Sequence, residues 1–258
     1  MRQMTIHGII RLQNQTLESG EMKKHIKWII PLAVLVLLAA VFFIYTGQYY
    51  HADERAYHVL VSNETVKVFK TDYGYFFDGP SEEDAFIFYP GAKVEETAYA
   101  PLCRELADAG LDVCLAKMPF HLAFFGMNAA EGIMEEYDYT HWYIGGHSLG
   151  GAIAASFAAK HTEGLDGLIL LAAYSATMQS DTLTTLLIYG SEDTVLNHEK
   201  YQESLKNLPG VYSEYVIEGG NHAQFGSYGP QKGDGTALIP AEWQIEETVR
   251  TILAFITR

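Results

Sequence analysis

Apolar and polar positions divide the chain into one long apolar run and a region of short, alternating segments. The run from Trp28 to Tyr45 contains no charged or strongly polar side chain and is long enough to cross the hydrocarbon layer of a bilayer as a helix. Pro31 fits its first turn, where backbone N–H groups have no partner within the helix. We therefore predict a transmembrane helix over residues 28–46, between an N-terminal segment 1–27 and a linker 47–56.

From residue 57 to residue 258 the pattern predicts a single α/β domain. Apolar runs without polar alternation, such as AFIFY at 85–89, are typical of strands that helices cover on both faces. Strands and helices in alternation predict a mostly parallel central sheet with helices on both faces. We expect strands at 58–62, 65–69, 73–77, 85–89, 111–116, 142–144, 167–173, 183–190 and 212–217, and helices at 97–109, 148–161, 197–208 and 240–257, with a further helix ending at 132–137.

The charges beside the apolar run predict its orientation in a membrane. Lys23, Lys24 and Lys27 precede it, whereas Asp53 and Glu54 follow it. By the positive-inside rule the N-terminus is cytoplasmic, and the domain lies outside the cell on a single-pass anchor. The alternative is a signal peptide that is cleaved and a secreted domain. A signal peptide has a shorter apolar region and an A-x-A cleavage site, and this pattern is absent here.

Composition and charge indicate which classes of binding partner the chain disfavours. The chain has 258 residues, 48% of them hydrophobic, and a net charge of −15, which is enough apolar material for a sizeable core. Residues 1–48 contain five basic and two acidic side chains, a net charge of +3, which leaves −18 for residues 49–258. A nucleic-acid-binding protein needs a basic face, so this function is disfavoured. Cys103 and Cys114 are too few for a disulfide-rich scaffold, and we expect two buried thiols, with a disulfide between them in an oxidising compartment as the alternative.

A glycine-rich turn between a predicted strand and a predicted helix contains the first candidate catalytic residue. Gly146, Ser148 and Gly150 form a G-x-S-x-G motif, which places a serine on a sharp turn with an exposed hydroxyl group. The backbone N–H of Leu149 would then face a developing oxyanion. The alternative is a serine that only caps the following helix. The strand before the motif and the alanine-rich helix after it favour the catalytic interpretation.

Two further turns follow predicted strands and complete a possible triad. Asp193 could accept a hydrogen bond from an imidazole, although spacing alone leaves Glu192 as an alternative. His222 lies on a glycine-rich loop after the last predicted strand. The chain has ten histidines, and most of them must have roles other than catalysis. The chain order Ser148, Asp193, His222 is the order of hydrolases with a nucleophile elbow.

These motifs, GGHSLGG at 145–151, YGSED at 189–193 and GGNHAQFG at 219–226, resemble those of the α/β-hydrolase superfamily over about residues 57–258. A second set of segments, YPGAKVEETAYAPL, MPFHLAF and NHAQFGSYGPQKGDG, is similar to a subgroup of compact bacterial α/β hydrolases. The resemblance implies an α/β-hydrolase fold and an acyl-enzyme mechanism. It also implies that the loop after the third strand supplies a second oxyanion N–H, by position that of Ala92, with Lys93 as the alternative.

The expected function is a membrane-anchored serine hydrolase that acts on small to medium carboxylic esters, with no cofactor and no metal. Only about ten residues, 174–183, separate two predicted strands where lids are inserted, so we expect no large lid. A non-catalytic binding domain at the cell surface, or thioester or peptide hydrolysis by the same triad, remains open. Aromatic residues that could line the substrate pocket, or simply pack under loops, are Phe120, Phe124, Tyr174 and Phe225.

Overall fold

The computed structural model describes residues 27–80 and 82–257, so the predicted segment 1–27 lies almost wholly outside the described residues. The chain divides between Gln48 and Tyr49 into two units. In the first unit, a single helix runs from Lys27 to Thr46, and its length and apolar composition are sufficient to cross a membrane. Its bounds agree with the predicted apolar helix at 28–46.

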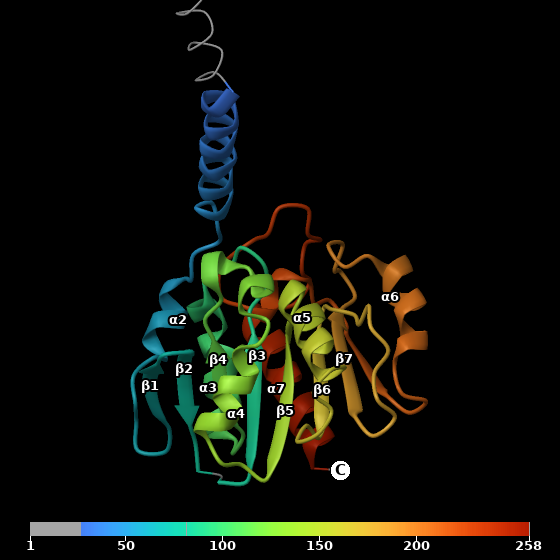
Figure 1. The fold of residues 1–258 in the computed structure, drawn as a ribbon. Coiled ribbons are helices and arrows are strands. Elements are labelled where there is room, and N and C mark those ends of the chain that lie inside the picture. Colours follow the sequence, from blue (N-terminus) through green and yellow to red (C-terminus); the bar gives the residue numbers. More distant parts are fainter. Residues whose placement is uncertain (1–26, 81, 258) are drawn as a thin grey trace, which may run out of the picture. The chain divides into compact units, whose positions relative to one another are not determined.

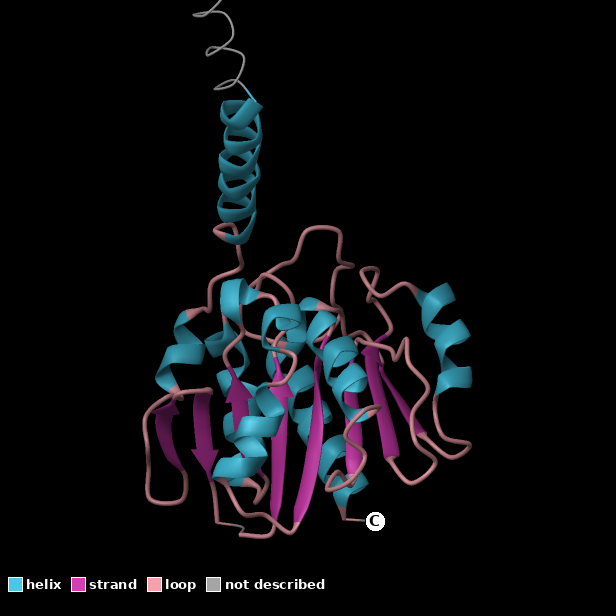
Figure 2. Ribbon diagram, viewed as in Figure 1, coloured by secondary structure: helices cyan, strands magenta, loops and turns pink. Residues whose placement is uncertain are grey.

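The second unit is built on an eight-stranded sheet in the order β1-β2-β4-β3-β5-β6-β7-β8 (Figure 1). β2 is antiparallel to both of its neighbours, β1 and β4. The remaining six strands, β4-β3-β5-β6-β7-β8 in sheet order, are parallel to one another (Figure 2). The carboxyl ends of these parallel strands therefore share one edge of the sheet. The strands are β1 Lys67–Thr71, β2 Gly74–Asp78, β3 Asp84–Tyr89, β4 Asp112–Ala116, β5 His141–His147, β6 Gly167–Leu171, β7 Thr184–Gly190 and β8 Ser213–Ile217.

Helices cover the sheet on both faces because the central strands are apolar on both faces. In β3, Phe86 and Phe88 belong to the core beneath α3 and α7, whereas Ala85 and Ile87 belong to the core beneath α4, α5 and α6. The helices are α2 Glu54–His58, α3 Ala100–Asp108, α4 Ala129–Glu136, α5 Leu149–Ala158, α6 His198–Ser204 and α7 Ala241–Ile256, with short 3-10 helices η1 Glu96–Tyr99, η2 Pro119–His121, η3 Ala123–Gly126, η4 Leu205–Asn207 and η5 Ala223–Phe225.

This architecture confirms the predicted mostly parallel sheet with helices on both faces, and residues 172–183 join β6 to β7 without a helix or strand. The predicted strand at 58–62 is wrong. Asp53 caps α2 by accepting hydrogen bonds from the N–H groups of Arg55 and Ala56, so the chain is helical up to His58. Part of the predicted linker 47–56 is therefore ordered in the second unit.

The two cysteines are free thiols and both are buried. Cys103 belongs to the core on the α3 and α7 face, and Cys114 belongs to the core on the opposite face. Burial raises the pKa of each thiol above its usual value, which disfavours the reactive thiolate.

Candidate active site

Ser148 occupies a strained turn between β5 and α5. Its φ of 53° and ψ of −124° define a backbone conformation that residues other than glycine rarely adopt. The turn is tight because the flanking glycines allow a close approach to the end of β3. A Cβ atom on Gly146 or Gly150 would lie 2.1 or 2.2 Å from the carbonyl oxygen of Tyr89. The sequence therefore needs glycine at both positions to form this elbow.

Two backbone N–H groups near Ser148 are candidates for oxyanion donors. Leu149 is the first residue of α5, so its N–H has no carbonyl partner one turn earlier in the helix. Ala92 lies on the loop after β3, as predicted for the second donor. The N–H of Lys93, the alternative donor, already donates to the carbonyl of His121 at 2.7 Å. The geometry therefore favours Ala92 over Lys93.

The structure brings Asp193 and His222 together at the carboxyl ends of β7 and β8. Nδ1 of His222 lies 2.8 Å from Oδ2 of Asp193, and both side chains are buried. The other carboxylate oxygen, Oδ1, accepts hydrogen bonds from the N–H groups of Val195 and Leu196. Glu192 instead accepts a hydrogen bond from the hydroxyl of Ser191. The carboxylate that meets the imidazole is therefore that of Asp193.

His222 also lies beside the serine turn. Its ring centroid is 4.4 Å from that of His147, the residue immediately before Ser148. Nε2 of His222 is buried and has no hydrogen-bond partner among the described residues. A histidine that is fixed through Nδ1 and open at Nε2 can accept a proton from a nearby hydroxyl group. Catalytic hydrogen bonds are often long before substrate binds, so this geometry is compatible with a Ser148–His222 pair.

A buried network behind the elbow was not predicted from the sequence. The hydroxyl of Tyr99 accepts a hydrogen bond from the N–H of Gly91 and lies 2.8 Å from Nδ1 of His147. A Cβ atom at Gly91 would lie 2.7 Å from that hydroxyl, so glycine is required where the two approach. Burial, and secondly repulsion from His222, holds the pKa of His147 well below its usual range. Tyr99 thus links the loop of Ala92 to the residue before Ser148.

A second set of positioning residues was also missed, and it holds the loop that carries His222. The carboxylate of Asp234 accepts hydrogen bonds from the N–H groups of His222, Ala223 and Gly235. Gln244, fully buried in α7, accepts from the N–H of Asn221 and donates to its carbonyl. The sequence signal for this loop was the Gly-Asp-Gly segment at 233–235. The sequence alone does not show which backbone N–H groups the carboxylate of Asp234 accepts hydrogen bonds from.

The aromatic residues predicted to line a pocket have different environments. Phe120 and Phe124 are 43% and 62% exposed, and Tyr174 is half-buried against the core beneath α5. Phe225 is only 1% exposed, and its ring lies 5.6 Å from that of His147. Phe225 therefore supports the histidine ring from within the core, whereas Phe120 and Phe124 lie at the surface.

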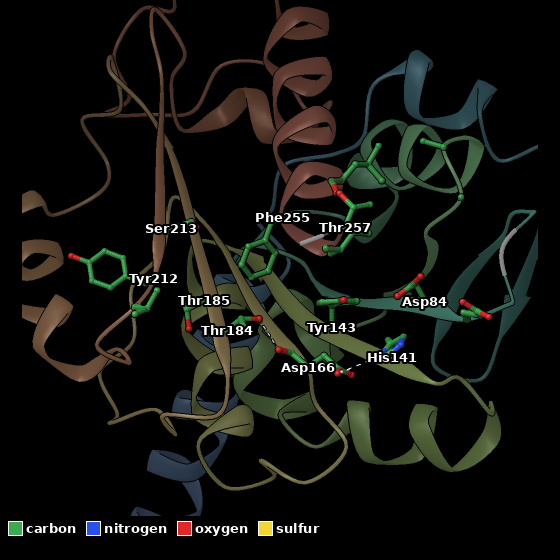
Figure 3. A pocket seen from close by; sticks show the side chains of 16 residues that line it. Asp84, His141, Tyr143, Asp166, Thr184, Thr185, Tyr212, Ser213, Phe255 and Thr257 are labelled. Atoms are coloured by element: carbon green, nitrogen blue, oxygen red, sulfur yellow. Dashed lines mark hydrogen bonds and ion pairs between the residues drawn. The ribbon is translucent and has the colours of Figure 1, made fainter.

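A cavity of about 600 Å³ lies at the opposite edge of the sheet, beside the amino ends of β3, β5, β7 and β8 (Figure 3). Nδ1 of His141 lies 3.3 Å from Oδ1 of Asp166, and the hydroxyl of Thr184 donates to the backbone carbonyl of Asp166. None of the predicted site residues lines this cavity. Within residues 27–80 and 82–257, no group of three or more His, Cys, Asp or Glu side chains is placed to hold a metal ion.

Comparison with solved structures supports the same fold. Est1E from Butyrivibrio proteoclasticus superposes with a TM-score of 0.54 at 15% identity, over 76% of this chain and 100% of that chain. A carboxylesterase from Bacillus subtilis gives a TM-score of 0.53 at 10% identity, over 79% of this chain and 95% of that chain. A putative hydrolase from Agrobacterium vitis gives 0.57 at 12% identity, over 75% and 100% of the two chains.

No curated protein sequence matches the chain. The model of the alpha/beta hydrolase family, in contrast, matches residues 85–246, which span all strands from β4 to β8 and every predicted site residue. This match covers more than half of the chain and agrees with the structural similarities in showing the α/β-hydrolase fold. The chain therefore belongs to the alpha/beta hydrolase family.

Proposed function

We propose that this hydrolase is a membrane-anchored serine hydrolase that cleaves small to medium carboxylic esters through a Ser148–Asp193–His222 triad. The observation that carries the proposal is the buried pair of Asp193 and His222, which lies beside the strained turn of Ser148 at one edge of the sheet. His222 is distinguished from His147, whose Nε2 is also without a hydrogen-bond partner among the described residues, because its Nδ1 meets a buried carboxylate instead of a tyrosine hydroxyl.

The chemistry follows from the roles of these groups. His222 would accept the proton of Ser148 as Oγ attacks the ester carbonyl, and Asp193 would stabilise the resulting imidazolium. The N–H groups of Leu149 and Ala92 would hold the oxyanion, each at a contribution of roughly 3 kcal/mol. His222 would then protonate the leaving alcohol. Water, activated by the same imidazole, would release the acyl group as a carboxylic acid and regenerate the serine.

The apolar helix supports anchoring at the membrane. Its 20 residues rise by ~30 Å, which matches the hydrocarbon thickness of a bilayer. Trp28 and Tyr45, near its two ends, are the residue types that favour the membrane–water interface. With Lys23, Lys24 and Lys27 before the helix, the catalytic unit would lie outside the cytoplasm.

A serine-directed fluorophosphonate probe tests the proposal. The full-length protein should be labelled and should hydrolyse short p-nitrophenyl esters, whereas Ser148→Ala should lose both activities. Ser156→Ala is a matched control, because the hydroxyl of Ser156 lies two turns along α5 and donates only to the carbonyl of Ala152. A folded wild-type protein that neither labels nor turns over esters would favour a non-catalytic binding domain instead.

A further inference from the structure

The helix and the catalytic unit are joined by a very short connection. Only Gly47 and Gln48 separate Thr46 from Tyr49, the first residue of the second unit. Three Cα–Cα steps span at most about 11 Å. If the 20-residue helix crosses the hydrocarbon core, it has no apolar length to spare, so Tyr49 must lie close to the lipid headgroups.

The residues after this connection are bound to the candidate active site. The ring of Tyr49 stacks on that of His121, with centroids 3.8 Å apart. The N–H of Tyr50 donates to the carbonyl of Lys93 at 2.7 Å, and the N–H of Glu95 donates to the carbonyl of Tyr50 at 2.9 Å. This short bridge lies directly beside Ala92, the proposed oxyanion donor. The chain thus leaves the helix and attaches at once to the loop of the catalytic edge.

The surface around this attachment point has the composition of a membrane-interface surface. Phe120, Phe124 and Phe125 on η2 and η3 are 43%, 62% and 45% exposed, and they flank or lie near His121. Exposed aromatic side chains of this kind insert into the headgroup region of a bilayer.

Basic side chains lie at the same edge, although the second unit is strongly acidic. Lys93 and Lys117 follow the carboxyl ends of β3 and β4. The N–H of Lys232 donates to the hydroxyl of Tyr50, which places this third lysine at the attachment point as well. Lysines at this edge would complement the phosphate groups of lipids, and the nearby carboxylates of Glu95 and Glu96 are largely buried against His51 and His121.

We propose that the catalytic edge works at the membrane surface and that the enzyme takes its substrate, an acyl ester dissolved in the bilayer, directly from the lipid. The inference rests on the proposed function and specifies its substrate class. In this proposal Phe120, Phe124 and Phe125 enter the headgroup layer, and the two-residue connection limits how far Tyr50, and the loop of Ala92 to which it is hydrogen-bonded through Lys93, can move from the bilayer. An ester that partitions into the bilayer then reaches the serine without crossing bulk water.

Lengthening the connection tests this inference in the full-length protein, reconstituted in phosphatidylcholine vesicles. A flexible Gly-Ser segment of about 20 residues between Gly47 and Gln48 releases the catalytic edge from the surface. We expect hydrolysis of a long-chain fluorogenic ester in the vesicles to fall about tenfold, since effective concentration falls steeply with tether length. Hydrolysis of a water-soluble short-chain ester should be unchanged.

The same insertion after Gly210 is a matched control. Gly210 is exposed and has no atom within 4 Å of an added Cβ, and it precedes β8 at the opposite edge of the sheet. This control should hydrolyse both esters at parental rates. In a second comparison, Phe124→Ser should lower the ratio of vesicle-ester to soluble-ester hydrolysis, whereas Val211→Ser, also exposed but at the opposite edge, should preserve that ratio.

Equal rates for the parent and the lengthened protein on both esters would overturn the inference while leaving the proposed function intact. Absence of turnover on both esters in the parent, together with absence of labelling at Ser148, would overturn the proposed function and the inference with it. The soluble ester thus distinguishes the two failures.

Discussion

At the scale of single residues, the carboxylate of Asp193 combines two roles that require burial. One oxygen accepts backbone N–H groups from Val195 and Leu196, and the other meets Nδ1 of His222. The backbone bonds fix the carboxylate so that the imidazole is held in one orientation. A buried carboxylate is tolerated here because both of its oxygens have hydrogen-bond partners.

We predict that Asp193→Asn lowers kcat on a soluble ester by roughly 10³–10⁴-fold, because the amide stabilises the wrong tautomer of His222 and cannot stabilise its protonated form. Glu192→Gln is the matched control, since its carboxylate accepts a hydrogen bond from the exposed hydroxyl of Ser191 and not from His222, and it should stay within about twofold of wild type. Steady-state kinetics with a thermal melt of each variant measures this. The reverse result would transfer the acidic role to Glu192.

His147 gives a prediction for stability against pH. Burial keeps the pKa of His147 well below the value of about 6.5 that it has in the unfolded chain. Below about pH 6.5 the His147 ring is therefore protonated in the unfolded chain but stays neutral in the folded protein. The free energy of unfolding then falls as pH falls, by up to about 1.4 kcal/mol per pH unit.

Urea unfolding between pH 7 and pH 5 measures this slope. His147→Gln removes the titrating ring and should give a shallower slope than wild type. Identical slopes for wild type and His147→Gln would contradict the assignment.

At the scale of elements, β3, β5 and α5 meet with no room for side chains. The Cβ positions of Gly146 and Gly150 both point at the backbone of Tyr89, and a Cβ on Gly145 would lie 1.9 Å from the carbonyl oxygen of Ile169 in β6. Backbone neighbours of this kind cannot move aside without shifting a whole strand. The elbow is therefore determined by the fit of three elements and not by the serine alone.

Gly150→Ala should lower the free energy of unfolding by roughly 1–3 kcal/mol, because the added methyl group would overlap the carbonyls of Tyr89 and Pro90. Gly210→Ala is the control, since open space surrounds its Cβ position, and it should leave stability within about 0.5 kcal/mol of wild type. Chemical denaturation compares the two. Equal stability of both variants would show that the junction relaxes more freely than the contacts indicate.

At the scale of the whole molecule, the proposed anchor predicts that residues 49–258 lie outside the cytoplasm. The native cysteines are buried, so a cysteine introduced at exposed Glu203 provides a unique label site. In intact cells, a membrane-impermeant maleimide should label Glu203→Cys, and wild type should remain unlabelled. Labelling only after the cells are made permeable would place the domain in the cytoplasm.

Much of the fold followed from local patterns in the sequence. Strand alternation and helix signals depend on neighbouring residues, so β3 to β8 and α7 lie close to their predicted positions. The strand predicted at 58–62 failed because the helix that Asp53 caps runs up to His58 and the carbonyls of Val59 and Val61 then accept hydrogen bonds from the guanidinium of Arg104 instead of pairing with a strand. The G-x-S-x-G motif likewise predicted the elbow, because the turn itself requires those glycines.

The apolar helix, the alternation of strands and helices from β3 onward, and the three turns that hold Ser148, Asp193 and His222 could all be predicted from the amino-acid sequence. Three-dimensional contacts were needed to show that Asp193, and not Glu192, meets the imidazole, and that Asp234 and Tyr99 hold the loops around it. Hydrophobic periodicity depends on residues that are close together in the chain, so it can be recognised without the fold. The direction in which a loop side chain points is set instead by contacts with residues distant in the chain.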